Sequence, residues 1–170
     1  MIRKLRISNF ALIEHLELEL SEGFTILTGE TGSGKSILLN AFSLISGNRS
    51  SSSVVGAYGK KAIVEIILSP NEDDEAFFEK NQLDSDSEVI LRREVTISGK
   101  SRAFINDSLV SLQLLKEYTS NRLLVHSQYN TYELKSKKTQ LELYDSMTGH
   151  DDDVMLFFEY YNDLISNREV

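Results

Sequence analysis

The sequence contains no cysteine, which excludes a disulfide framework and a thiolate metal site. No run approaches the roughly 18 consecutive apolar residues that a membrane-spanning helix needs. The basic start of the chain also lacks the uninterrupted apolar stretch of a signal peptide, because Glu14, Glu17 and Glu19 interrupt it. These absences fit a cytoplasmic location.

Composition is that of an ordinary globular protein. The 170 residues are 41% hydrophobic and 26% charged, which suits one domain that buries a substantial core. The net charge of −8 argues against a chain covered by a DNA-binding surface. The acidity is concentrated in residues 72–75 and 151–153, whereas several basic residues lie between positions 92 and 102. Overall charge therefore does not decide whether DNA binds.

One stretch, GETGSGKS at residues 29–36, matches the P-loop pattern G-x-x-x-x-G-K-[ST] at every fixed position. Its glycines let successive backbone N–H groups wrap around a phosphate chain. A helix that begins at about Gly34 adds unpaired N–H donors and the positive end of its dipole. Lys35 is expected to reach the β- and γ-phosphates, and Ser36 to bind Mg²⁺. The candidate nucleotide-binding residues are Gly29, Glu30, Thr31, Gly32, Ser33, Gly34, Lys35 and Ser36.

The flanking residues strengthen this interpretation. Phe24–Thr28 is a short apolar run that predicts a strand entering the loop. Ser36–Ser46 predicts a helix that is buried on nearly all sides, with Gly47 as its C-terminal stop. Strand, glycine loop and helix are the order that the motif requires. The alternative of a chance glycine-rich turn is disfavoured because sequence and context agree.

The rest of the chain alternates between short strands and helices. Ile2–Asn9 and Leu16–Leu20 have apolar residues at period two, which predicts a hairpin-like pair ahead of the P-loop strand. A Ser- and Gly-rich loop, expected to be mobile unless a ligand or partner orders it, covers Asn48–Gly59. Further strands are predicted at Ala62–Leu68, Glu88–Ile97, Ser101–Asn106 and Arg122–His126, and helices at Asp74–Asn81, Ser111–Tyr118 and Lys137–Met147.

The last residues predict an amphipathic helix. From Asp151 onward, apolar side chains fall at Val154, Phe157, Tyr161 and Leu164, and the acidic trio at 151–153 suits a helix N-terminus. The pattern covers about two heptads, fewer than a coiled coil requires. A coiled coil and a helix docked on the domain both remain open. The pattern stops at position 170 without a capping residue, from which we expect a truncated chain.

Several motifs together resemble a known family. They are I-x-x-L-x-I-x-N-F-A-L-I (Ile2–Ile13), the P-loop, L-R-R (Leu91–Arg93), S-R-A-F-I-N (Ser101–Asn106) and H-S-Q (His126–Gln128). Their order and spacing are similar to the N-terminal part of the RecN family of bacterial DNA-repair proteins, in the SMC-like branch of the ABC ATPases. The resemblance implies an α/β fold, a P-loop NTPase of ABC/SMC-head type. This chain would form its first lobe, with an antiparallel β subsheet and the root of a helical arm.

The resemblance also implies a domain organisation. Residues 1–149 correspond to the N-terminal lobe of the ATPase head, with the P-loop at 29–36 and a Q-loop near 128. Residues 150–170 correspond to the start of a coiled-coil arm, and the C-terminal lobe is absent.

Further site residues follow from the resemblance alone. Gln128 corresponds to the Q-loop glutamine, which in the family approaches Mg²⁺ and the attacking water; a polar residue that ends a strand is the alternative. Lys35 and Gln128 are the implied catalytic residues, and Ser36 and Gln128 the implied Mg²⁺ ligands. Asn9 and Phe10 occupy a position beside the nucleotide, although core packing explains Phe10 equally well. Arg49 lies where SMC-like proteins can carry an arginine acting on phosphates or DNA, but a solvated loop arginine is the favoured interpretation.

Two motifs of the family are missing. Neither the Walker B pattern, four apolar residues followed by Asp-Glu, nor the signature L-S-G-G occurs. In the family both follow the arm, in the second lobe. The implied ligands are ATP and Mg²⁺, and the implied protein partners are the C-terminal lobe and a second head in a homodimer. DNA is a partner of the full-length protein, with weak or no binding by this acidic chain, and no membrane is involved. We expect weak nucleotide binding, almost no hydrolysis, and a cytoplasmic, nucleoid-associated location.

Three alternatives compete with this hypothesis. The chain also fits the head of another SMC-like ATPase, of RecF or condensin type. A non-catalytic interaction module that pairs through the arm helix is an alternative of a different class. A small P-loop kinase or GTPase is disfavoured, because no acceptor pocket and no base-specificity motif such as N-K-x-D is recognisable.

Overall fold

The computed structural model describes residues 1–30, 34–120, 122–123, 125, 156–157, 160–161 and 164. The chain forms two compact units, Met1–Val125 and His126–Val170. The described residues of the second unit are helical and exposed. Within the described part of the chain, no helix combines the length and apolarity needed to span a bilayer.

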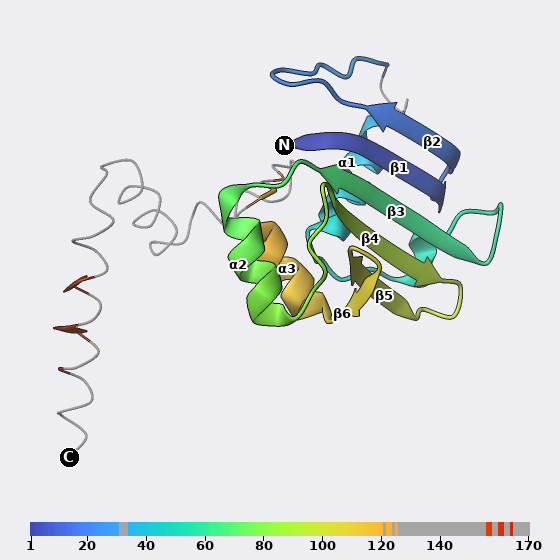
Figure 1. The fold of residues 1–170 in the computed structure, drawn as a ribbon. Coiled ribbons are helices and arrows are strands. Elements are labelled where there is room, and N and C mark those ends of the chain that lie inside the picture. The colour runs from blue at the N-terminus through green and yellow to red at the C-terminus, as the bar shows by residue number, and fades with distance from the viewer. Residues whose placement is uncertain are drawn as a thin grey trace. The chain divides into compact units, whose positions relative to one another are not determined.

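An antiparallel sheet forms the centre of the first unit (Figure 1). Its strands neighbour one another in the order β2-β1-β3-β4-β5-β6, so that β1 and β3, which are far apart in the sequence, pair directly. The antiparallel subsheet expected from the sequence is confirmed. The strands are β1 (Ile2–Phe10), β2 (Ile13–Glu19), β3 (Lys61–Leu68), β4 (Val89–Thr96), β5 (Ser101–Ile105) and β6 (Ser108–Val110). The helices are α1 (Lys35–Ile45), the 3₁₀ helix η1 (Ser52–Val54), α2 (Glu72–Asn81) and α3 (Leu112–Ser120).

The inner face of the sheet carries the core. Alternate residues of β3 and β4 point to one side, where Val64, Ile66 and Leu91 are fully buried. Helix α1 packs on β3 and β4 and buries the side chains of its C-terminal half. Its solvent side leaves Leu39 exposed, so the expectation of a helix buried on nearly all sides is wrong for the described residues. The reason is that the sheet covers one side of the helix.

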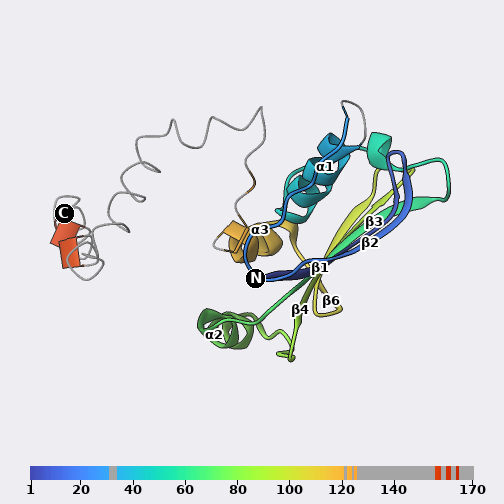
Figure 2. The same cartoon turned by 90° about the horizontal axis from the view of Figure 1, so that it is seen from above.

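Helices α2 and α3 lie side by side, held by aromatic rings and a buried ion pair (Figures 1 and 2). Phe78 stacks on Tyr118 with ring centroids 5.6 Å apart. Asp74 accepts hydrogen bonds from the Tyr118 hydroxyl at 2.9 Å and from Arg122 at 3.1 Å. Burial and the bond to Asp74 raise the pKa of the Tyr118 hydroxyl. This contact ties the end of α3 to the start of α2.

Most predicted elements are confirmed to within a few residues, but two strands are not. Phe24–Thr28 is not a strand, and Phe24 is 89% exposed. The sheet ends at β2, so this segment has no partner strand among the described residues. Of Arg122–His126, the described residues 122, 123 and 125 are not in a strand, because the chain turns there after α3. Strand β6 was not predicted, and the helix expected at Lys137–Met147 lies outside the described residues.

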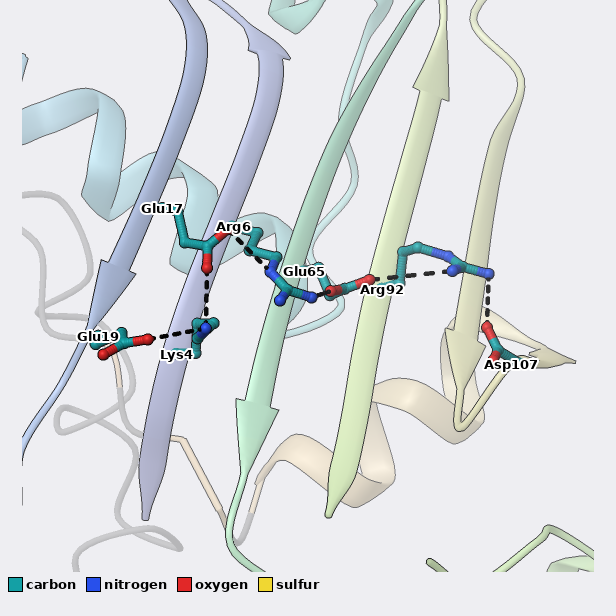
Figure 3. A network of polar contacts seen from close by, with 7 residues as sticks. All are labelled: Lys4, Arg6, Glu17, Glu19, Glu65, Arg92 and Asp107. Atoms are coloured by element: carbon teal, nitrogen blue, oxygen red, sulfur yellow. Dashed lines mark hydrogen bonds and ion pairs between the residues drawn. The ribbon is translucent and has the colours of Figure 1, made fainter.

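A network of ion pairs crosses the outer face of the sheet, on the side opposite the core (Figure 3). Each basic side chain in it contacts at least two carboxylates, at N–O distances from 2.9 to 4.0 Å. Its members are Lys4, Arg6, Glu17, Glu19, Glu65, Arg92 and Asp107. The hydrogen bond from Lys4 lowers the pKa of Glu17. The positive charges of this network are therefore balanced within the sheet.

The basic residues between positions 92 and 102 do not form one patch. Arg92 lies on the outer face, 4.5 Å from the ring centroid of Phe104. Arg93 points to the inner face, where it is 1% exposed and donates one hydrogen bond, of 2.7 Å, to the Ser101 hydroxyl. Its Nε has no partner in the described structure, and burial lowers the pKa of its guanidinium. Neighbours in the sequence thus lie on opposite faces of the sheet.

Substitutions of Arg122 and Arg93 should change the free energy of unfolding in different ways. Arg122→Met leaves the Asp74 carboxylate buried without its cation and should lower the free energy of unfolding by about 3 kcal/mol. Arg93→Met removes a buried charge that no carboxylate of the described residues balances, so stability should stay within about 1 kcal/mol of wild type or rise. Urea unfolding measures both. Equal losses in the two variants would contradict this assignment of the ion pairs.

Candidate nucleotide-binding site

Helix α1 begins at the end of the predicted P-loop without a side-chain cap. Gly34 is the N-cap residue, with a left-handed φ of 96° that favours glycine. Its carbonyl accepts the N–H groups of Ile37 and Leu38, which begins the helix. No side chain caps this terminus and its first turn contains no acidic residue. The positive end of the helix dipole therefore faces a space that no protein carboxylate of that turn fills.

Lys35 is exposed and folds back over the loop. Its ammonium donates hydrogen bonds to the carbonyl oxygens of Gly29 and Glu30, the second at 2.7 Å. The next residue, Ser36, is also exposed at the first turn of α1. Residues 31–33 of the predicted loop lie outside the described residues, as does Gln128. The described part of the loop thus presents one cation and one hydroxyl beside the helix terminus.

A cavity of about 500 Å³ opens beside Lys35, between β2, residues 27–28 and α1. Most of its walls are apolar, and Glu14 and His15 add polar groups that the sequence analysis did not single out. Both residues lie at the start of β2, and no motif in the sequence marks them as site residues. The lining residues are Leu12, Ile13, Glu14, His15, Leu16, Leu18, Leu27, Thr28, Gly34, Lys35 and Leu38.

A second cavity, of about 410 Å³, lies on the other side of the β1–β2 turn. Phe10 and Ala11 line it, together with α1 and the serine-rich loop that carries Arg49. The turn therefore separates the two cavities, because Leu12 and Ile13 line the first one. The lining residues of the second are Phe10, Ala11, Asn40, Ser43, Leu44, Asn48, Arg49, Ser50, Ser51, Ser53 and Val54.

Asn9 and Phe10, which the resemblance assigns to the nucleotide's surroundings, are both buried. Phe10 faces the second cavity. The side-chain amide of Asn9 lines neither cavity; it donates to the carbonyl of Lys61 and accepts the N–H of Tyr58, each at 2.9 Å. In the part of the chain that the structure describes, no group of three or more His, Asp or Glu residues is arranged to hold a metal. Arg49 is exposed at the cavity.

Comparison with known proteins identifies the family. A family model described as an AAA domain matches residues 4–168. The DNA repair protein RecN of Vibrio cholerae serotype O1 is 40% identical over 154 residues, which are 89% of this chain and 28% of that protein. RecN of Bacillus subtilis strain 168 is 36% identical over 152 residues, 88% of this chain and 26% of that protein. The chain thus spans about a quarter of the length of these relatives.

Solved structures agree on the fold. A crystal structure of the Smc head domain with an extended coiled coil from Pyrococcus furiosus matches 99% of this chain and 46% of its own, with a TM-score of 0.71 and 19% identity. The recombination mediator protein RecF with ATP matches 65% of this chain and 27% of its own, with a TM-score of 0.51 and 18% identity. These structures show the fold, a P-loop NTPase fold of ABC/SMC-head type. The family model over residues 4–168 and the RecN relatives show that the chain belongs to the AAA domain family, as a relative of the RecN proteins.

Proposed function

We propose that this chain is the ATP-binding lobe of a RecN-like, SMC-family ATPase that acts in DNA double-strand break repair and recombination. The observation that carries the proposal is the uncapped start of α1, which opens beside an exposed Lys35 and a cavity of about 500 Å³. The glycines and backbone N–H groups of residues 29–36 cradle the phosphates. Phe10 lines the second cavity and not the one beside Lys35, so in this proposal it packs behind the β1–β2 turn.

Lys35 has a defined task in this proposal. Its ammonium, which now binds the carbonyl oxygens of Gly29 and Glu30, turns to the β- and γ-phosphates when ATP enters. A bound Mg²⁺ would supply positive charge to offset that of the phosphates. Ser36 and Gln128 are its proposed protein ligands. Since Mg²⁺ keeps several waters and needs few protein groups, the single hydroxyl of Ser36 among the described residues fits such a site. Gln128 also places the attacking water.

In this proposal, other parts of the assembly complete the nucleotide-binding site. Phe24, Ile26 and Leu27 are exposed although their sequence is typical of a buried strand. We assign this segment to an interface with a C-terminal lobe of the same protein, which supplies the carboxylate that polarises water. A second head in a homodimer completes the site. Nucleoid association is proposed to come from DNA binding by the whole assembly. The ion-pair network on the outer face of the sheet offers DNA no excess positive charge (Figure 3).

A second candidate function rests on the helical residues after position 150. The described side chains there expose a row of large apolar groups, and the rings of Phe157 and Tyr161 stack 6.1 Å apart. An interaction module that pairs through this helix, independently of nucleotide, would use such a surface. The exposed residues are Leu156, Phe157, Tyr160, Tyr161 and Leu164.

Calorimetric titration with ATP and Mg²⁺ tests the main proposal. Wild type should bind weakly, and Lys35→Ala should lower the affinity by at least about tenfold, because a charge-assisted phosphate contact is lost. Lys100→Ala, at the exposed β4–β5 turn, is the control and should bind like wild type. Hydrolysis should be close to background. Robust turnover that disappears in Lys35→Ala would overturn the split site, and equal binding by all three proteins would overturn the P-loop assignment.

Substitution of two glycines with similar left-handed φ values distinguishes an effect on ATP binding from an effect on stability. Gly34 and Gly99 have φ values of 96° and 79°, and a Cβ added at either position meets no atom within 4 Å. Ala at each position should therefore cost about 1 kcal/mol of unfolding free energy. Gly34→Ala should also weaken ATP binding severalfold, whereas Gly99→Ala should not. Equal ATP affinities in the two variants would contradict a cradle that depends on Gly34.

Analytical ultracentrifugation distinguishes the second candidate from the first. The main proposal predicts a monomer in the absence of nucleotide, both for wild type and for a variant that lacks residues 151–170. A nucleotide-independent dimer that is lost on this deletion would instead favour the interaction module.

A further inference from the structure

We infer that Asn9 is a positioning residue. It holds the serine-rich loop, Asn48–Gly59, against the β1–β2 turn, a contact that we call the lock. The lock fixes the position of the wall between the two cavities. Asn9 itself has a left-handed φ of 51°, a conformation that asparagine tolerates better than most residues. It is 5% exposed, with both ends of its side-chain amide bonded to the backbone of residues 58 and 61. One of its two amide N–H groups and one lone pair of its amide oxygen are thus used within the protein.

Backbone contacts extend the lock along the loop. The N–H of Gly56 donates to the carbonyl of Asn9 at 2.9 Å, and the N–H of Ala11 donates to the carbonyl of Val54 at 2.7 Å. Phe10 and Val55 form an antiparallel bridge between these two bonds. The loop is thus held at both the backbone and the side chain of Asn9. Serine-rich loops favour mobility, and these bonds restrain residues 54–58 of this one.

Gly56 shows how closely the two segments approach. A Cβ at this position would lie 2.6 Å from Oδ1 of Asn9 and 2.7 Å from the carbonyl oxygen of Ala11. Only a residue without a side chain fits between them. The lock therefore has a second required member, which lies on the loop itself.

The position of the lock gives it a functional consequence. The β1–β2 turn lines the cavity of Lys35 with Leu12 and Ile13, and lines the cavity of Arg49 with Phe10 and Ala11. The serine-rich loop supports the Arg49 side of this turn. Releasing the loop should loosen the wall that both cavities share. The effect on ATP binding rests on the proposed function, whereas the lock itself does not.

The chain contains a matched control for this residue. Asn106 is also left-handed, with a φ of 46°, and its amide makes the same two kinds of bond. It accepts the N–H of Ile90 at 2.8 Å and donates to the carbonyl of Asp84 at 2.9 Å. Neither cavity includes it. Replacing either asparagine by glycine keeps the backbone conformation accessible and removes comparable bonds.

Hydrogen exchange and ATP titration of Asn9→Gly, Gly56→Ala and Asn106→Gly test the inference on the 170-residue chain. Asn9→Gly and Gly56→Ala should speed exchange of the amides of residues 54–58 by on the order of tenfold, with α1 and β3–β5 unchanged. Asn106→Gly should speed exchange at Ile90 and leave residues 54–58 as in wild type. Both lock variants should bind ATP several times more weakly than Asn106→Gly.

The possible results distinguish the existence of the lock from its effect on ATP binding. Wild-type exchange at residues 54–58 in Asn9→Gly would overturn the lock. Faster exchange there with unchanged ATP affinity would overturn the positioning role. If wild type itself binds no ATP, the proposed function fails, and exchange alone decides whether the lock exists.

Discussion

The packing of α1 on the inner faces of β3 and β4 is the contact on which the rest of the site depends. Ala41, Leu44 and Ile45 anchor the C-terminal half of the helix in the core. The first residues of the helix, Lys35 and Ser36, are exposed, Gly34 turns the chain before them, and no side chain caps the first N–H groups. An anion is the natural complement of such a terminus. The proposed binding chemistry therefore depends on which half of the helix is buried.

The two faces of the sheet have different chemistry because side chains alternate along each strand. The inner face packs the helices, and the outer face carries a chain of paired charges (Figure 3). Arg92 and Arg93 illustrate the division, since one joins the outer network and the other is buried among apolar residues. The basic cluster in the sequence is therefore not evidence for a DNA-binding surface on this sheet.

Sequence patterns predicted most of the helices and strands whose formation depends on neighbouring residues in the chain. The helix that follows the P-loop motif, the period of two in β1 and β2, and the helix that starts near Ser111 were all recognisable, and Ser111 accepts the N–H of Leu114. Strand β6 was missed although Asn106-Asp107, both with positive φ, is a typical two-residue hairpin turn. Phe24–Thr28 was assigned to a strand by its composition, but strand formation needs a partner, which composition does not reveal. A motif likewise does not show that the amide of Asn9 is already bonded within the protein.

The most direct test of the account is to map bound ATP by amide chemical shifts in the 170-residue chain with Mg²⁺. The account predicts that the largest changes fall in residues 29–36 and at the β1–β2 turn, and that β4, β5 and β6 change little. Changes centred on the outer face of the sheet or on α2 and α3, with residues 29–36 unaffected, would contradict it.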